Sequence, residues 1–443
     1  MKRALAIVLI GSGLACSVFR TRIPPYPAGV VFPLAESARI GVEGGIVRSL
    51  VASEKRLYFS TDKGFVYCLD EAGHKLLWAY AAGAALGCPP APGAGAIAVW
   101  DAENSVHGID KNGGLIWKKR LPDTLSSDIC PARDRFYAGT KEGRLYALDA
   151  SSGEVLWSFK AEGAVEAACA VWGNSVVCGA VDGRLYFLGP QGKLLGSYDA
   201  GAAIRTTLLV DGERVYFGSD DGRFSCLDLR SRKRVWRIRT DGKVLTPARA
   251  DGKRVYFAAS NTVLYAVDKS DGDIDWWTIL PSRSPFSPEF ADGTILAASS
   301  SSVIVALDRR TGRETGRYDA GAEARSNPIW ASPDIFIALH DSSSAKGGLA
   351  DLSKQIKVEL AASPPAPGAV GTEVALTASA VGFHLPRYEF FVRRDGQTSV
   401  MQKESERNSW TWFPDKVGKF VVGVRVRDAK VSKEAEMPFD IAK

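Results

Sequence analysis

The protein has 443 residues, with 44 Gly, 11 Trp, 13 Tyr and 19 Phe but only 3 Met. A chain of this length normally forms more than one domain or one large repeat domain, and its many aromatic and turn-forming residues favour β-structure. The net charge of +6, from 56 basic and 50 acidic side chains, is a small excess over so large a surface. It argues against a nucleic-acid partner.

Residues 1–15 have the pattern of a secretory signal peptide, in which the basic start MKR precedes an apolar run and small residues follow. The run is too short to span a bilayer. The sequence LAC, ending at Cys16, resembles a bacterial lipobox, although Gly13 stands where that box normally has Leu. We favour lipidation of Cys16, because an unpaired Cys has little other use there. Ordinary signal cleavage after the sequence GLA is the alternative.

One motif recurs along the chain, typified by GRLYALDASSGEVLW at residues 143–157. It combines an alternating strand, an Asp/Gly turn and a Trp. Aligned on the Asp, the copies lie at Asp70, Asp110, Asp149, Asp228, Asp268 and Asp308, with intervals of 40, 39, 79, 40 and 40 residues. The doubled interval contains a degenerate copy, with Gly189 in place of the Asp. A period of this length is typical of a structural repeat.

Each copy predicts four short antiparallel strands, which in the third copy are SSDICPA, RFYAGT, RLYALD and VLWSFKA. Four strands in such a period form one blade of a β-propeller. Seven copies run from residue 44 to 321, and we assemble an eighth blade from residues 322–352 and an N-terminal strand within 30–43, which would close the ring. We therefore predict an eight-bladed β-propeller over residues 30–352, with seven blades as the alternative, after a tether of residues 16–29.

Residues 353–443 differ from the repeats. The segments YEFFVRRDG, SWTWFP and GKFVVGVRVRD alternate with period two and resemble strands of bacterial immunoglobulin-like modules. We predict an immunoglobulin-like β-sandwich here, which makes the whole chain all-β. Such modules bind partners or act as spacers, and both roles remain open.

The pattern formed by Ala147, Asp149, Gly153 and Trp157 is similar to the tryptophan-docking motif of PQQ-like, or quinoprotein-type, propellers. This family contains pyrroloquinoline-quinone (PQQ) dehydrogenases and the non-enzymatic BamB-like lipoproteins of outer-membrane protein assembly. In physical terms, the Asp can accept hydrogen bonds from the turn, the Gly can adopt a positive φ, and the Trp can be buried between neighbouring blades.

We therefore assign a structural docking role to the recurring Asp, Gly and Trp side chains. They are Asp70, Trp78, Asp110, Trp117, Asp149, Gly153, Trp157, Asp228, Trp236, Asp268 and Trp276. Gly196 and Gly316 stand where two further Trp residues are expected, so the fourth and seventh blades are predicted to be the loosest.

The dehydrogenase branch would imply PQQ, calcium ligands, a catalytic Asp and usually a disulfide between adjacent cysteines. This chain has no Cys-Cys pair and no C-x-x-C-H haem motif. The acidic segment DKSDGDID, residues 268–275, does not have the spacing of a calcium loop, and we interpret it as a solvated turn. We predict no catalytic, cofactor-binding or metal residues and no cofactor, with PQQ and calcium as the alternative.

The cysteines are interpreted as packing residues. The repeat alignment places Cys88, Cys130 and Cys169 at one inner-strand position, with Thr246, Ser287 and Asn327 in other copies. A two-residue turn at 173–174 would also set Cys169 opposite Cys178, so we expect either free thiols or a disulfide there.

A basic run, LRSRKRVWRIR at residues 229–239, falls on the outer strand of the fifth blade. Positive charge on an edge strand prevents it from pairing with a strand of another molecule, which is the interpretation we prefer. Binding of an acidic partner or of lipid headgroups is the alternative.

Taken together, these patterns predict a non-catalytic binding scaffold of the cell envelope, located in the periplasm or on the outer membrane by a lipid anchor. We expect a monomer that binds an envelope protein, and resemblance to the BamB-like branch implies a role in outer-membrane protein assembly. The alternative is a PQQ-dependent oxidoreductase.

Overall fold

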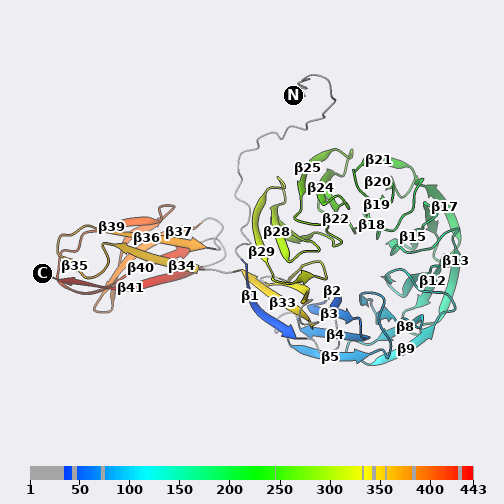
Figure 1. The fold of residues 1–443 in the computed structure, drawn as a ribbon, viewed down its shortest axis with the longest axis horizontal. Helices are drawn as coiled ribbons and strands as arrows, with labels where there is room; N and C mark the ends of the chain where they lie inside the picture. The colour runs from blue at the N-terminus through cyan, green and yellow to red at the C-terminus, as the bar shows by residue number, and fades with distance from the viewer. Residues whose placement is uncertain are drawn as a thin grey trace, which may run out of the picture.

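The structure is a computed structural model that describes residues 34–41, 47–70, 75–244, 246–331, 334–341, 346–354, 357–381, 386–427 and 432–442. Within these ranges the chain forms 41 β-strands and no helix. The strands build ten antiparallel or largely antiparallel sheets. Figure 1 shows most of them arranged as a ring around a central axis, with the C-terminal strands in a separate sandwich.

Seven consecutive sheets of the ring each contain four strands in sequence order. We number them sheets 1 to 7. Sheet 1 contains β2 (Val47–Ser53), β3 (Arg56–Thr61), β4 (Phe65–Asp70) and β5 (Leu76–Ala81); sheet 2 contains β6 (Ala91–Pro92), β7 (Ile97–Trp100), β8 (Ser105–Ile109) and β9 (Leu115–Arg120). Sheet 3 contains β10 (Cys130–Pro131), β11 (Arg135–Gly139), β12 (Arg144–Asp149) and β13 (Val155–Lys160); sheet 4 contains β14 (Ala170–Trp172), β15 (Ser175–Gly179), β16 (Arg184–Leu188) and β17 (Leu194–Asp199).

The second half of the ring repeats this arrangement. Sheet 5 contains β18 (Leu209–Asp211), β19 (Arg214–Ser219), β20 (Arg223–Asp228) and β21 (Arg234–Arg239); sheet 6 contains β22 (Arg249–Ala250), β23 (Arg254–Ala258), β24 (Val263–Asp268) and β25 (Ile274–Ile279). Sheet 7 contains β26 (Glu289–Ala291), β27 (Thr294–Ala298), β28 (Val303–Asp308) and β29 (Glu314–Asp319). In each sheet the first strand, which is only two or three residues long in sheets 2 to 7, lies nearest the central axis and the fourth lies at the outer edge (Figure 1).

An eighth sheet of the ring combines both ends of the repeat region. It contains β30 (Glu323–Ala324), β31 (Ile329–Ala331), β32 (Asp334–Asp341), β33 (Lys346–Lys354) and the N-terminal strand β1 (Leu34–Gly41). β1 pairs antiparallel with β33, with Leu34 opposite Lys354 and Gly41 opposite Gly348. The ring is thus closed by hydrogen bonds between its two ends.

The middle two strands of each sheet carry the buried core. In sheet 3, β11 and β12 are buried over nearly their whole length, whereas β13 alternates between exposed and half-buried side chains. Continuous burial means that both faces of these strands are covered. Each face packs on a neighbouring sheet, and one core cluster accordingly joins Tyr137 of sheet 3 to Tyr186 of sheet 4.

A β-bulge interrupts the pairing of the third and fourth strands in every one of sheets 1 to 7. In sheet 3 the register shifts between Ala147, opposite Trp157, and Leu148, opposite Val155. The bulge follows the Asp/Gly turn directly and bends the outer strand locally. This bend sets the repeated Trp at the start of the outer strand.

The C-terminal strands form a two-sheet sandwich. One sheet has the order β34 (Lys357–Ser363), β36 (Val374–Val381) and β39 (Ser409–Trp412). The other has the order β35 (Gly368–Ala369), β41 (Ser432–Ala442), β40 (Gly418–Arg427), β37 (Arg387–Arg394) and β38 (Gln397–Ser405). Trp412 packs edge-on against Phe420 and Phe439 between the sheets, within a core cluster of its own.

Candidate functional site

The repeated Asp side chains hold the turns that follow the third strand of each sheet. Oδ1 of Asp149 accepts hydrogen bonds from the backbone N–H groups of Ser151 and Ser152, both at 2.9 Å. Asp110, Asp228 and Asp268 accept equivalent bonds, and these bonds hold the pKa of each carboxyl below its usual value. Asp70 precedes residues that lie outside the described ranges.

Each repeated Trp reaches across to the next sheet. Its indole Nε1–H donates to a backbone carbonyl 33 residues farther along, which follows the turn-forming position of the next repeat. The pairs are Trp78 with Lys111 at 2.9 Å, Trp117 with Ala150 at 3.0 Å, Trp157 with Pro190 at 2.9 Å, Trp236 with Lys269 at 3.0 Å and Trp276 with Arg309 at 3.2 Å. The structure therefore joins each Trp to the turn of the following copy.

A glycine of that following turn lies directly under the indole. Gly153 has φ +70°, and a Cβ built on it would lie 2.4 Å from Cε3 of Trp117. Trp78, Trp157, Trp236 and Trp276 cover Gly113, Gly192, Gly272 and Gly312 in the same way. Glycine is thus required for two reasons. It adopts the positive φ of the turn, and its lack of a Cβ leaves room for the neighbouring indole.

Sheet 4 lacks the Trp, and sheet 5 supplies a replacement that the sequence analysis missed. Gly196 occupies the Trp position, and Arg232, with φ +57°, occupies the Gly position of the next turn. The guanidinium group of Arg232 lies beside Gly196, donates to the carbonyl of Leu195 and lies over the ring of Phe187 at 5.8 Å. An arginine from sheet 5 therefore fills the space that the Trp of sheet 4 would fill, and this contact counts against sheet 4 being among the loosest.

The basic run over residues 229–239 is largely engaged within the protein. Arg237 donates to the hydroxyl of Tyr198 and the carbonyl of Ala200 on sheet 4, at 3.1 and 3.3 Å. Arg230 pairs with Glu213. Exposed cations such as Arg234 remain at the outer edge. Much of the run therefore serves the contact between sheets 4 and 5.

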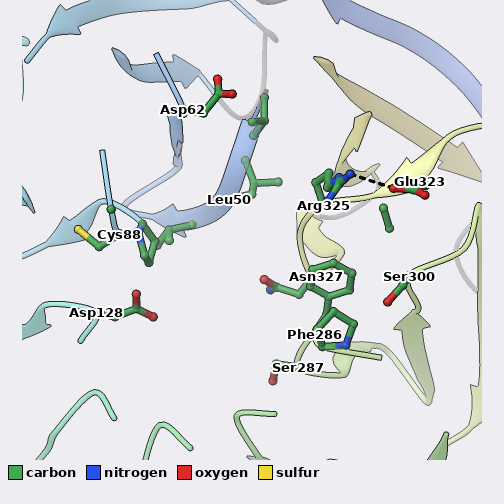
Figure 2. Close-up of a pocket in the computed structure, with 16 residues that line it drawn as sticks. Leu50, Asp62, Cys88, Asp128, Phe286, Ser287, Ser300, Glu323, Arg325 and Asn327 are labelled. Atoms are coloured by element: carbon green, nitrogen blue, oxygen red, sulfur yellow. Dashed lines mark hydrogen bonds and ion pairs between the residues drawn. The ribbon is translucent and has the colours of Figure 1, made fainter. Parts of the chain in front are cut away.

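A cavity of about 690 Å³ opens in the central channel, lined by residues of sheets 1, 2, 3, 7 and 8. Figure 2 shows Asp128 and Cys88 on one side of it, and Asn327 and Phe286 on the opposite side. Leu50 and Val51 of β2 contribute an apolar wall. The volume is in the usual range for a ligand pocket, and the lining combines apolar and polar groups as such pockets do.

The carboxylates of the ring differ in whether a cation pairs with them. Glu166 and Asp220 both pair with Arg205, and Glu289 pairs with Arg249 of the preceding sheet. Asp128 has no cationic partner among the described residues. Its side chain is exposed to the channel, yet the surrounding protein partly desolvates the carboxylate, and this desolvation raises its pKa.

The carboxylates of the acidic segment 268–275 are engaged by neighbouring protein groups. Asp268 accepts from the hydroxyl of Ser270 at 2.6 Å, Asp271 accepts from the N–H of Asp273, and Asp275 pairs with Arg254 and Lys253. No cluster of three or more His, Cys, Asp or Glu side chains that could hold a metal ion occurs in the described part of the chain. These carboxylates do not fit the calcium that a PQQ site requires.

The inner-strand cysteines do not share one position, contrary to the sequence alignment. Cys88 accepts a hydrogen bond from the backbone N–H 12 residues later, as Thr246 does. In sheet 3 this place belongs to Ser127, so Cys130 lies farther along the chain. The inner strands are only two or three residues long, which gave the alignment too little pattern to fix their register.

Cys169 directly precedes β14 and Cys178 lies in β15, around a two-residue turn with Trp172 opposite Ser175 and Ala170 opposite Val177. Both are free thiols in this structure. Burial raises the pKa of Cys169 well above its usual value, and the neighbouring Cys178 raises it further. Disulfide formation between them stays a prediction.

A buried polar network between sheets 1 and 2 was not foreseen from the sequence. His107 accepts or donates at both ring nitrogens, to Tyr80 Oη at 2.7 Å and to Asp101 Oδ2 at 2.8 Å. Burial lowers the pKa of His107. Burial would raise the pKa of Asp101, but hydrogen bonds from His107 and Ser105 lower it overall. The spacing of these residues carries no local signal, because Tyr80 comes from another repeat.

Cys16 lies outside the described residues. Within the described ranges, no helix is long and apolar enough to cross a membrane.

The chain is similar to a known protein family and to several solved structures. The family model described as "Outer membrane protein assembly factor BamB" matches residues 33–120, 102–191 and 182–345. Among solved structures, BamB from Moraxella catarrhalis superposes with a TM-score of 0.61 at 14% identity, covering 73% of this chain and 98% of that one. The computationally designed Ika8 protein gives 0.61 at 15% identity (71% and 99% covered), and Sqt1 from Saccharomyces cerevisiae gives 0.59 at 11% (71% and 98%).

The comparison with curated proteins finds no match. At these identities the structural likenesses establish the fold, a β-propeller of PQQ-like repeats. The family model covers residues 33–345, which is most of the chain. The chain therefore belongs to the BamB family of outer-membrane protein assembly factors.

Proposed function

We propose that this protein is a non-catalytic scaffold of the bacterial cell envelope that binds a protein of outer-membrane assembly. The family match over residues 33–345 carries this proposal. The docking residues support it, because Asp149 is engaged in its own turn and Trp157 reaches the next sheet, which leaves neither free for chemistry. The protein would act in the periplasm or at the outer membrane.

We interpret the eight sheets of the ring as eight propeller blades over residues 30–352 and the sandwich as an immunoglobulin-like domain over residues 353–443. The contacts of each Trp with the next sheet support a docking role, in which the repeated Asp, Gly and Trp residues hold adjacent blades together. The sandwich would extend the binding surface or act as a spacer.

Exposed apolar side chains at the outer edge support protein recognition. We define the apolar rim as the exposed pairs at the starts of β5, β9, β13 and β17, which are Leu76 and Leu77, Leu115 and Ile116, Val155 and Leu156, and Leu194 and Leu195. On β29 the same places hold Glu314 and Thr315. Contiguous exposed apolar groups on one part of a soluble protein are typical of a protein-binding surface.

Photocrosslinking in intact cells tests the proposal. A photoreactive residue at Val155 on the apolar rim should capture an outer-membrane assembly protein that mass spectrometry identifies. The matched control carries the same residue at Glu314, which has the equivalent register on sheet 7, and should not capture it. Loss of the crosslink in a Leu156→Glu background is also expected. Equal capture at both positions would overturn the role of the rim.

Reconstitution with PQQ and calcium tests the catalytic alternative. We expect no cofactor absorbance and no dye reduction with alcohols or aldoses. Activity would overturn the scaffold proposal.

We further propose that Cys16 carries a lipid anchor and that the protein is a monomer. Mass spectrometry of the mature N-terminus should detect the lipid, and a Cys16→Ala variant should lack it. A variant that still carries lipid would contradict this assignment.

A further inference from the structure

The central cavity carries an inference about what the scaffold recognises, and it rests on the function proposed above. Its lining comes from five sheets, so residues far apart in the sequence meet there. Figure 2 shows that the space lies between the Asp128 side and the side formed by Asn327 and Phe286. Asp128, Asn327 and Phe286 therefore line one and the same cavity.

Asp128 is a carboxylate of the cavity lining to which no described residue supplies a counter-ion. Glu323 and Arg325, on one wall, satisfy each other at 2.9 Å. Elsewhere in the ring, Arg205 pairs with both Glu166 and Asp220, and Lys243 also pairs with Asp220. Asp128 has no such cation within the described residues. Because Asp128 is exposed to the channel and no described cation pairs with it, its carboxylate is available to pair with a cation supplied from outside.

Apolar side chains also line the cavity. Phe286 is half-buried at the cavity surface, and Leu50, Val51 and Pro285 line it as well. A cavity with an aromatic ring on one side and a carboxylate on the other suits a cation on a carbon stem, because the stem can pack on the apolar side chains while the charge reaches the carboxylate. The Asn327 amide adds a hydrogen-bonding group.

We propose that this cavity binds an arginine or lysine side chain of a partner polypeptide, with the cation paired to Asp128 and the stem or an apolar neighbour against Phe286. The shared chemistry is an ammonium or guanidinium group on an aliphatic chain. A free polyamine has the same chemistry, so the experiment separates the two sources.

The test uses the full-length purified protein and terminally blocked peptides observed by NMR line broadening. The peptide acetyl-Leu-Arg-Leu-amide should bind, and acetyl-Leu-Gln-Leu-amide should not. Asp128→Asn should weaken binding at least ten-fold, and Phe286→Ala should weaken it several-fold. The control Asp241→Asn removes an exposed carboxylate outside the cavity and should leave the affinity unchanged.

Binding by Asp128→Asn as tight as by the unmodified protein would overturn the proposal. Tighter binding of spermidine than of the Arg peptide would overturn the polypeptide source. Because peptide binding is measured with purified protein, its failure leaves the crosslinking result intact, and failure of the crosslink leaves the peptide result intact.

Discussion

Replacing Gly153 by alanine tests whether the contact between Trp and glycine holds neighbouring sheets together. The substituted Cβ would lie 2.4 Å from Cε3 and 2.6 Å from Cδ2 of Trp117. The indole cannot stay in place at such distances, so it must shift away from the turn. That shift would stretch its 3.0 Å hydrogen bond to the carbonyl of Ala150.

The expected cost has three parts. A non-glycine residue at φ +70° costs about 1 kcal/mol. Overpacking against the indole adds about 1–3 kcal/mol, and weakening of the hydrogen bond adds about 1 kcal/mol. We therefore expect Gly153→Ala to destabilise the ring by about 3–5 kcal/mol.

Gly173→Ala is the matched control. Gly173 also has a positive φ, +58°, but nothing lies within 4 Å of the Cβ position. Its substitution should cost only about 1 kcal/mol. In a Trp117→Ala background the clash is gone, so Gly153→Ala should then cost no more than this control, which corresponds to a coupling of about 2–4 kcal/mol.

Differential scanning calorimetry of the full chain measures these differences. The sandwich has its own core cluster, so its transition serves as an internal reference. At about 2 °C per kcal/mol for a domain of this size, Gly153→Ala should lower the ring transition by about 6–10 °C and Gly173→Ala by about 2 °C. Equal shifts for the two variants, or an undiminished effect without Trp117, would refute the reasoning.

Three further predictions follow from the same contacts. Arg232→Gly should destabilise the ring by about 1–2 kcal/mol, because loss of the hydrogen bond and ring contact outweighs relief of the positive φ, whereas Arg234→Ala at the exposed edge should change it by less than about 0.5 kcal/mol. The pKa of Asp149 is lowered in the folded state, so its stabilisation is present above about pH 4 and is lost as pH falls further; Asp149→Asn should flatten the acid side of a plot of ring melting temperature against pH. After aerobic purification, thiol labelling with and without reductant should give a mass difference of two labels if Cys169 and Cys178 pair, and Cys169→Ala should abolish that difference.

The turn and the repeat unit could be predicted from the sequence, because the residues that determine them lie close together in the chain and recur. Asp149 and Gly153 lie within one turn, and their spacing to Trp157 repeats often enough to identify the unit. The contact partner of each Trp was not predictable in the same way, because it lies 33 residues away in the next repeat. A single copy therefore predicts the turn, and only the assembled ring shows what the Trp covers.

Other features of the ring could not be predicted, because some strands are very short and because a residue of one repeat can fill a place left empty in another. The inner strand of sheet 3 is two residues long, so the pattern could not place Cys130 relative to Cys88. The missing Trp at Gly196 predicted a loosely held sheet. No residue close to Gly196 in the sequence indicates that Arg232 of the next repeat occupies the place of that Trp. The sequence does contain one sign of the replacement: Arg232 follows Asp228 by four residues, as Gly153 follows Asp149, so an Arg stands where the repeat has Gly.

Departures from the repeat divide into those that the protein compensates internally and those that it does not. Gly196 is compensated by Arg232, and the buried Asp101 by its ion pair with Lys118 and the hydrogen bond from His107. Such compensated departures preserve the ring and need no external ligand. Asp128 is different, since no described cation pairs with it although its pKa is raised by desolvation. Its carboxylate is exposed in the channel, where the proposed partner would supply the missing cation.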